Sequence, residues 1–369
     1  MAKLLVTGGA GFIGCNFVRY WRDTRPGDEI TVLDALTYAG RRENLAGIGA
    51  IRFVHGDICE TELVETLLRE FGIDTIVHFA AESHVDRSIA DPDAFIRTNV
   101  TGTHSLLRAA TAIWLNGEAT LPHRFHHVST DEVYGTLEPD EPAFTETTPY
   151  APNSPYAASK AASDHLVRAA HRTYGLQVTT SNCSNNYGPY QHPEKLIPLF
   201  LSNALHGRPL PIYGDGQNVR DWLHVDDHCE AIGKILDDGR AGETYNIGGG
   251  AELPNLSIIA TICATLDTLF AEDPGLAIRY PDSPPAKGCA TASLKRFVTD
   301  RPGHDRRYAI DATKIERELN FRPTRDFATG IAETCRWYLA NAQAGAEPLH
   351  SQPASASSTE TAGNIRKAS

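Results

Sequence analysis

The chain has 369 residues, 41% hydrophobic and 22% charged, a composition typical of a soluble globular protein with one large α/β unit or two closely joined domains. Its formal net charge of −12 argues against nucleic acid as a partner, because nucleic acid is held through a basic, phosphate-neutralising surface. The first residues lack an apolar signal segment, and no run approaches the roughly 20 apolar residues of a membrane span, so we expect a cytoplasmic protein without a membrane partner.

Metal ligands and disulfides are not expected. The seven cysteines are dispersed along the chain without a close pair, which indicates isolated thiols. His126 and His127 are adjacent, but they fall inside an expected strand and no companion ligands lie nearby in the sequence.

Short β-branched runs alternate with longer helical stretches in the first half of the chain. This repetition predicts the α/β class, with a Rossmann-type, doubly wound parallel sheet. Ligands of such sheets bind beyond the carboxyl ends of the strands, so the residues that follow each strand are the candidates for function. The expected strands are Lys3–Thr7, Glu29–Asp34, Ile51–Val54, Thr75–Ala80, Arg124–Thr130 and Gln177–Asn182, and the expected helices include Glu62–Glu70 and Ala94–Ala112.

Three regions follow from the change of composition along the chain. Residues 1–184 are expected to form the Rossmann-type domain, to which a segment near residues 220–250 returns. From about Asn185, proline and glycine become frequent, which predicts shorter elements and a smaller, mixed α/β domain over residues 185–340. Residues 343–369 are rich in small and polar side chains, which predicts a disordered tail.

A glycine-rich segment, Gly8-Gly9-Ala10-Gly11-Phe12-Ile13-Gly14, directly follows the first expected strand and opens a helix. Such glycines let the backbone approach a pyrophosphate at the helix N-terminus, whereas the alternative is a plain glycine turn. Asp34 ends the second strand twenty residues after Gly14, where a carboxylate would accept from a ribose 2′-hydroxyl and repel a 2′-phosphate. The pattern therefore predicts NAD in preference to NADP. Asp57 and Ile58, after the third strand, are candidates for contacts to the adenine, or else form only a turn.

Tyr156 and Lys160 are four residues apart, so on a helix they share one face. A nearby ammonium lowers the pKa of a phenol, which would make Tyr156 a base for a sugar hydroxyl. The alternative is a solvated helix pair.

Two adjacent carboxylates, Asp131 and Glu132, follow Thr130 at the end of the fifth expected strand. A simple dehydrogenase needs one base, whereas an acid and a second base would allow water to be eliminated from an oxidised sugar. The alternative is that both carboxylates only cap the next helix or turn.

Over about residues 3 to 340, the sequence resembles the extended short-chain dehydrogenase/reductase family and, within it, the dTDP-glucose 4,6-dehydratases. The resemblance rests on several long motifs in the right order: Leu36 to Gly40, Ala80 to Ser88, Thr130-Asp131-Glu132, Tyr156 with Lys160, Asn185 to Pro189, Pro193 to Pro198, Arg220-Asp221-Trp222 and Asp300 to Tyr308.

The resemblance implies a hydro-lyase that converts dTDP-glucose to dTDP-4-keto-6-deoxyglucose and water with a recycled NAD. Tyr156, assisted by Thr130 and Lys160, would take the C4 hydroxyl proton during oxidation at C4. Glu132 would then remove the C5 proton, Asp131 would protonate the departing C6 hydroxyl, and hydride would return to C6.

The same resemblance implies binding residues for both ligands, with the Rossmann-type domain holding NAD and residues 185–340 mainly the nucleotide sugar. Arg220 is the candidate for the pyrophosphate, because a guanidinium fork suits phosphate oxygens; the alternative is an ion pair with Asp221 or Asp226. The implied NAD residues are Gly8, Gly11, Phe12, Ile13, Gly14, Asp34, Leu36, Thr37, Asp57, Ile58, Ala81, Ser83, Thr98, Tyr156, Lys160 and Asn186; the implied sugar-nucleotide residues are Ser83, Thr130, Asn185, Lys195, Leu196, Pro211, Tyr213, Arg220, Asn255 and His304.

Two other classes compete with this interpretation. A nucleotide-sugar epimerase or decarboxylase would keep the Tyr and Lys but would not need both an acid and a base after Thr130. A non-catalytic redox sensor would be expected to have lost Tyr156 or Lys160. The resemblance also implies a homodimer formed by helices such as Ala94–Ala112 and Ala157–Tyr174, although core packing would give them the same apolar faces.

Overall fold

The computed structural model describes residues 1–116, 122–300 and 303–341, so the predicted tail over residues 343–369 lies outside the described residues. Its largest element is a seven-stranded sheet in the order β10-β6-β5-β4-β1-β2-β3, in which every neighbouring pair is parallel. All six expected strands are present, with ends shifted by at most two residues, and the predicted Rossmann-type fold is confirmed. The strands are β1 (Lys3–Thr7), β2 (Glu29–Asp34), β3 (Arg52–His55), β4 (Thr75–His78), β5 (Arg124–Thr130), β6 (Val178–Cys183) and β10 (Thr244–Ile247).

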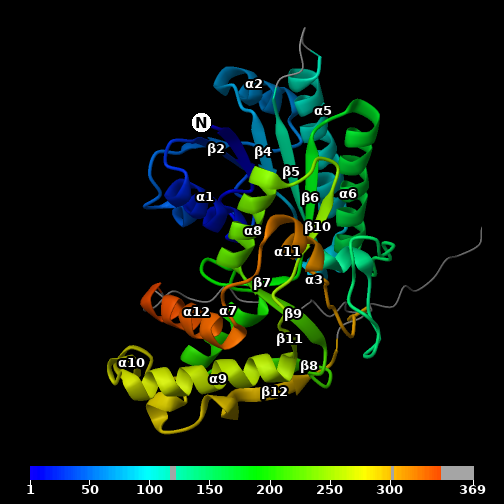
Figure 1. The fold of residues 1–369 in the computed structure, drawn as a ribbon. Helices are drawn as coiled ribbons and strands as arrows, with labels where there is room; N and C mark the ends of the chain where they lie inside the picture. The colour runs from blue at the N-terminus through cyan, green and yellow to red at the C-terminus, as the bar shows by residue number, and fades with distance from the viewer. Residues whose placement is uncertain (117–121, 301–302, 342–369) are drawn as a thin grey trace, which may run out of the picture.

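Helices cover both faces of this sheet (Figure 1). One apolar core lies under α1 (Phe12–Thr24), α8 (Val225–Asp238) and α11 (Thr313–Leu319). A second core lies under α2 (Thr61–Phe71), α5 (Thr103–Trp114) and α6 (Pro155–Tyr174). The chain returns to the sheet after residue 184, because α8 and β10 both pack there. The expected helix over residues 94–112 is built from α4 (Asp93–Phe95), the π-helix η2 (Ile96–Gly102) and α5, and α3 (Val85–Ala90) precedes it.

A second group of elements lies beyond one end of the sheet (Figure 1), and the expectation that its elements are short is wrong for α9, with 18 residues, and α12, with 15. It has its own apolar core, to which α7, α9, α10 and α12 contribute. Its strands form two small sheets, β11-β9-β7 and β12-β8. These elements are β7 (Asn185–Tyr187), α7 (Leu196–Leu205), β8 (Leu210–Tyr213), β9 (Val219–His224), β11 (Glu252–Pro254), α9 (Asn255–Glu272), α10 (Gly275–Arg279), β12 (Lys295–Val298) and α12 (Phe327–Asn341).

Helix α9 corrects one expectation from the sequence. By length and composition it could cross a membrane, since it has 18 residues and a mean hydropathy of 1.2, although no segment was expected to approach such a span. One face of α9, which includes Ile258, Ile262 and Leu266, is fully buried in the core shared with α7 and α12. The apolar side chains of α9 therefore have a packing role in this fold.

We predict that Ile262→Ala lowers the free energy of unfolding by about 2–5 kcal/mol, because it leaves a cavity at a position with no solvent exposure. Ile278→Ala is the matched control: Ile278 is 85% exposed, so its truncation should change stability by less than about 0.5 kcal/mol. Urea unfolding of both variants measures the difference. Equal stabilities would contradict a core role for α9.

Candidate active site

A cleft of about 340 Å³ lies at the carboxyl ends of the parallel strands. Its wall is formed by the residues that end or follow β1, β2, β3, β4, β5 and β6. Parallel strands end at the same edge of a sheet, which is why segments far apart in the sequence meet here.

The glycine-rich loop after β1 allows a close backbone approach that side chains would prevent. Gly8 has φ +69°, and a Cβ at this position would lie 2.6 Å from the backbone nitrogen of Ala80. A Cβ at Gly14 would lie 2.3 Å from the carbonyl oxygen of Gly8. Helix α1 begins at Phe12 without a side-chain cap and without an acidic residue in its first turn. Its free N–H groups therefore suit an anionic group such as a pyrophosphate, and the plain-turn alternative does not account for this geometry.

Asp34 lies at the end of β2 and orders the loops around it. Its carboxylate accepts hydrogen bonds from the backbone N–H groups of Ala10, at 2.9 Å, and Leu36, at 2.8 Å. Burial raises the pKa of Asp34, and these two hydrogen bonds oppose the shift. Each carboxylate oxygen has a further lone pair, so the side chain can still accept from a ribose hydroxyl.

Asp57 lies on the cleft wall after β3 and does more than end a strand. Its carboxylate accepts from the backbone N–H of Cys59 at 2.8 Å and pairs with Arg97 at 2.8 Å. Burial alone would raise the pKa of Asp57, but the Cys59 hydrogen bonds and the Arg97 charge lower it.

The residues predicted to bind NAD fall together in this cleft, with one exception. Leu36 does not line the cleft; it has a left-handed backbone, φ 49°, and packs against the apolar core under α1. The other fifteen, Gly8, Gly11, Phe12, Ile13, Gly14, Asp34, Thr37, Asp57, Ile58, Ala81, Ser83, Thr98, Tyr156, Lys160 and Asn186, all contribute to the wall. This donor set fits a dinucleotide, because it offers a helix N-terminus and a carboxylate at the end of the second strand.

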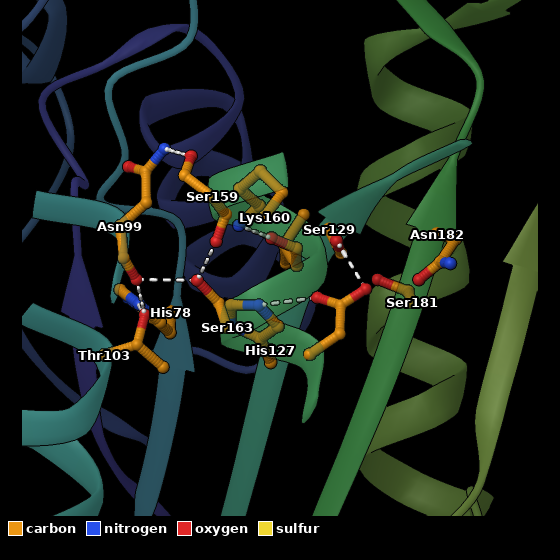
Figure 2. Close-up of polar contacts among 12 residues, drawn as sticks. His78, Asn99, Thr103, His127, Ser129, Ser159, Lys160, Ser163, Ser181 and Asn182 are labelled. Carbon is orange, nitrogen blue, oxygen red and sulfur yellow. Dashed lines mark hydrogen bonds and ion pairs between the residues drawn. The ribbon is translucent and has the colours of Figure 1, made fainter. Parts of the chain in front are cut away.

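Tyr156 and Lys160 lie on the first turns of α6, which begins at Pro155 with a Ser154 cap. Both side chains are buried, so the alternative of a solvated helix pair is wrong. Lys160 Nζ donates to the carbonyl oxygen of Val128 at 2.9 Å. Helix α6 is also fixed against η2, since Asn99 Nδ2 donates to Ser159 Oγ at 2.8 Å (Figure 2).

The pKa of Tyr156 is raised in the protein alone, and not lowered as the nearby ammonium of Lys160 led us to expect. Burial raises the pKa of Tyr156 well above its usual value, the carboxylate of Glu132 raises it further, and a hydrogen bond with Thr130 opposes both. The sequence placed the ammonium one turn from the phenol but could not show that its hydrogen bond is directed to Val128. Burial also lowers the pKa of Lys160.

Asp131 and Glu132 form a short 3₁₀ turn directly after β5. The capping alternative fails for Asp131, because the side chain of Thr130 accepts from the backbone N–H of Glu132 and forms the cap. Asp131 is buried, and its Oδ2 has no hydrogen-bond partner among the residues that the structure describes. Burial raises the pKa of Asp131 well above its usual value, and Glu132 and Asp221 add to the shift. This shift favours the protonated form of the Asp131 carboxyl group, which is the form that a proton donor requires.

The residues predicted to bind the nucleotide sugar fall into two groups. Ser83, Thr130, Asn185 and Lys195 line the cleft. The other six do not line the cleft and lie in the second group of elements beyond the sheet: Leu196 at the start of α7, Pro211 and Tyr213 on β8, Arg220 on β9, Asn255 at the start of α9, and His304. The rings of Tyr213 and His304 are 6.4 Å apart, and the backbone N–H of Asn255 donates to the carbonyl oxygen of Asn218.

Arg220 is buried and directed toward the backbone of the segment around Asp305. Its guanidinium donates to the carbonyl oxygens of Val219, at 2.7 Å, and Asp305, at 2.8 Å, and lies over the ring of Tyr308. The two carboxylates considered as ion-pair partners of Arg220 have other contacts. Asp221 accepts from the backbone N–H groups of Gly249 and Ala251, and Asp226 pairs with Arg325. The positive charge of Arg220, which lies on β9, also lowers the pKa of Asp131, which follows β5.

Several residues of the cleft wall were not predicted. Cys183 ends β6 and Ser184 follows it, so the rule that pointed to Thr130 after β5 would have found both. Gln191 and His192 also line the cleft, but they lie in an irregular segment that carries no comparable signal.

A parallel sheet with a glycine-rich loop after β1, and a buried Tyr156–Lys160 pair beside Thr130, defines an extended short-chain dehydrogenase/reductase. The family model for GDP-mannose 4,6 dehydratase matches residues 5–334. The dTDP-glucose 4,6-dehydratase of Xanthomonas campestris pv. campestris is 56% identical over 92% of this chain and 94% of its own length. The chain therefore belongs to the GDP-mannose 4,6 dehydratase family and, within it, to the dTDP-glucose 4,6-dehydratases.

Solved structures agree with this assignment. The crystal structure of DesIV, a dTDP-glucose 4,6-dehydratase from Streptomyces venezuelae with NAD and TYD bound, is 52% identical, with a TM-score of 0.80 over 92% of this chain and 97% of that one. A UDP-glucose 4-epimerase from Thermus thermophilus, in complex with NAD, is 29% identical, with a TM-score of 0.77 over 92% of this chain and 100% of that one. The epimerases share the fold, so the fold alone does not separate the two activities.

We predict that Gly14→Ala weakens NAD binding at least about tenfold, because the added Cβ would lie 2.3 Å from the carbonyl oxygen of Gly8 and push α1 away from the loop. Gly27→Ala is the control, since no atom lies within 4 Å of a Cβ there. Calorimetric titration with NAD measures both variants. Equal affinities would show that the loop does not hold the dinucleotide.

Proposed function

We propose that this chain is a dTDP-glucose 4,6-dehydratase that converts dTDP-glucose to dTDP-4-keto-6-deoxyglucose and water, with Thr130, Asp131, Glu132, Tyr156 and Lys160 as catalytic residues. One observation supports this assignment of roles: the buried Oδ2 of Asp131, next to Glu132, has no hydrogen-bond partner in the described part of the chain and lies beside the buried Tyr156–Lys160 pair. A neutral carboxyl group adjacent to a second carboxylate supplies an acid and a base at one place.

In the first step Tyr156 takes the proton of the C4 hydroxyl. When bound along the loop at Gly8 to Gly14 and Asp34, NAD would supply the hydride acceptor for C4 and the hydride donor for C6, and its positive charge would favour the phenolate form of Tyr156. Lys160 stabilises the same phenolate electrostatically, and Thr130 hydrogen-bonds to the phenol. These contributions are needed because burial alone keeps the phenol protonated.

In the second step the two carboxyl groups remove water across C5 and C6. The ketone at C4 acidifies the C5 proton, which Glu132 takes. Asp131 gives its proton to the C6 hydroxyl, which leaves as water. Glu132 returns its proton to C5 as C6 is reduced, and the proton taken by Tyr156 is released to restore Asp131. The net change is the loss of one water molecule from the sugar.

Binding roles follow the two groups of residues. Residues 1–184, with the returning segment near 220–250, would hold NAD through the loop at Gly8 to Gly14 and through Asp34, whose carboxylate faces the cleft. Residues 185–340 would bind mainly the nucleotide, with Arg220 on the pyrophosphate. Selection of thymine over uracil depends on burial of one methyl group, worth on the order of 1 kcal/mol.

An epimerase is the rival activity on this fold, and the site disfavours it. Epimerisation requires oxidation and reduction at C4 but no elimination, so it has no use for a buried acid beside a base. Burial raises the pKa of Asp131 and so favours its protonated form, which a general acid requires and a structural carboxylate does not.

The chain would work as a cytoplasmic homodimer, with the helical layer of α5 and α6 as the interface. Ile89 and Ile96, which are 46% and 50% exposed, precede α5 and would contribute apolar surface. Light scattering coupled to size-exclusion chromatography is expected to give twice the chain mass of 40.2 kDa. A monomer mass at micromolar concentration would rule this interface out.

We predict that the purified protein forms the 4-keto-6-deoxy product from dTDP-glucose without net accumulation of reduced cofactor, measured by the absorbance of the product in alkali. Tyr156→Phe should lower turnover at least about 100-fold and prevent oxidation at C4. Asp131→Asn and Glu132→Gln should lower product formation similarly, yet keep oxidation, so reduced-nicotinamide absorbance should rise in these variants only.

Other outcomes discriminate between the activities. If the enzyme converts UDP-glucose but not dTDP-glucose, the proposed preference for thymine over uracil is wrong. Formation of a C4 epimer without the keto product would establish the rival activity. If no nucleotide sugar gives product even with NAD added, the enzyme assignment is wrong.

A further inference from the structure

A buried carboxylate that the proposed reaction does not use lies directly behind the Tyr156–Lys160 pair. Asp164 follows Lys160 by one helical turn on α6, so the two side chains share a face of the helix. Asp164 is only 5% exposed, and it does not line the cleft. Its charge therefore serves contacts inside the protein.

The hydrogen bonds of Asp164 reach His127 and Ser129 on β5, both labelled in Figure 2, and Tyr150 in the loop before α6. Its Oδ1 accepts from Nε2 of His127 at 3.1 Å, and its Oδ2 accepts from the hydroxyls of Ser129 and Tyr150, both at 2.9 Å. Burial lowers the pKa of His127 well below its usual value, so the ring is neutral and its Nε2–H is the donor. The carboxylate is thus satisfied by three neutral donors, which preserves its negative charge.

These contacts flank the anchor of the catalytic lysine. Lys160 Nζ donates to the carbonyl oxygen of Val128, which lies between His127 and Ser129 on β5. Asp164 therefore holds the residues on both sides of Val128, while Lys160 holds Val128 itself. Helix α6 and strand β5 are joined by the two side chains in a fixed register.

Asp164 also compensates the charge of Lys160. Burial lowers the pKa of Lys160, and the Asp164 carboxylate opposes that shift. Burial raises the pKa of Asp164 to about 6, so it is a carboxylate at neutral pH. Burial raises the pKa of the Cys183 thiol to about 12 and lowers the pKa of His78, so neither group carries charge at neutral pH. The other titratable groups that act on Lys160 or Asp164 are Tyr134 on η3, Tyr150 before α6, His165 on α6, His78 on β4, His127 on β5 and Cys183 on β6.

We propose that Asp164 is a positioning residue for the catalytic pair: its carboxylate clamps β5 on both sides of the Lys160 anchor and keeps the buried Lys160 ammonium charged. This inference rests on the proposed function of Tyr156 and Lys160. Without the charge of Asp164, a desolvated ammonium would lose its proton at lower pH and could no longer stabilise the phenolate of Tyr156.

The test measures Lys160 directly. The enzyme is produced with lysine labelled with ¹³C at Cε, the Lys160 signal is assigned by its absence in Lys160→Arg, and its titration is followed by NMR. In Asp164→Asn the signal should titrate about one pH unit or more below its value in the wild-type enzyme. The kcat for dTDP-glucose should fall at least about tenfold, with the basic limb of its pH profile moved to lower pH and KM little changed.

Tyr150→Phe is the matched control, because it removes one hydrogen bond from Asp164 and keeps the charge. Lys160 should titrate in this variant as in the wild type. The lost hydrogen bond should raise the pKa of Asp164, so the acidic limb of the kcat profile should move to higher pH. If Asp164→Asn does not fold, the acidic limb of the kcat profile of Tyr150→Phe tests the proposal. An acidic limb at the same pH as in the wild type would overturn it.

Two results separate this inference from the proposed function. An unchanged Lys160 titration in folded Asp164→Asn would reduce Asp164 to a structural residue, even if kcat fell. If the wild-type enzyme does not turn over dTDP-glucose, the proposed function fails, but the NMR titration still decides whether Asp164 keeps Lys160 charged.

Discussion

The parallel pairing of β4, β5 and β6 is the constraint on which the site depends. In this register His78 lies opposite His127, and Thr130 lies opposite Cys183, so neighbouring strands end together. Segments that are remote in the sequence, from the glycine loop after β1 to the acidic turn after β5, are thereby brought to one cleft. A slip of one residue in β5 would exchange the faces of all its side chains and separate Asp131 from Tyr156. The polar contacts of Asp164 with β5 oppose such a slip from outside the ladder of backbone hydrogen bonds.

Burial supplies most of the electrostatics of this site. The same loss of water raises the pKa of Asp131 and lowers the pKa of Lys160, which favours a neutral acid but works against a charged ammonium. The two groups differ in their partners. Within the described residues Asp131 Oδ2 has no hydrogen-bond partner, whereas Lys160 has a carbonyl acceptor and a carboxylate one helical turn away. Removal of one partner of a buried charge is costly, because the other is left uncompensated. Asp164 thus contributes both to the fold and to the charge state of the site.

The sequence was sufficient for the features that depend on local pattern. The periodic strands, the glycine loop and the polar residues at strand ends were predicted, because the carboxyl-end rule needs only strand assignments. It was insufficient where the answer depends on direction or depth of burial. The spacing of Tyr156 and Lys160 does not reveal that Val128 takes the ammonium, or that burial dominates the pKa of the phenol. The left-handed backbone at Leu36 and the pairing of β7, β9 and β11, strands of three to six residues joined over long distances, carry no periodic signal.

Arg220 shows how the second group of elements can influence chemistry that takes place on the first. Its guanidinium is held on β9 by backbone carbonyls and by the ring of Tyr308, and its charge lowers the pKa of Asp131, which follows β5. A pyrophosphate bound by this guanidinium would offset that charge, and the pKa of Asp131 would rise further. The acid would then be most fully protonated when a nucleotide sugar is in place. Binding energy from the nucleotide, which takes no part in the reaction, would in this way prepare the group that expels water from the sugar.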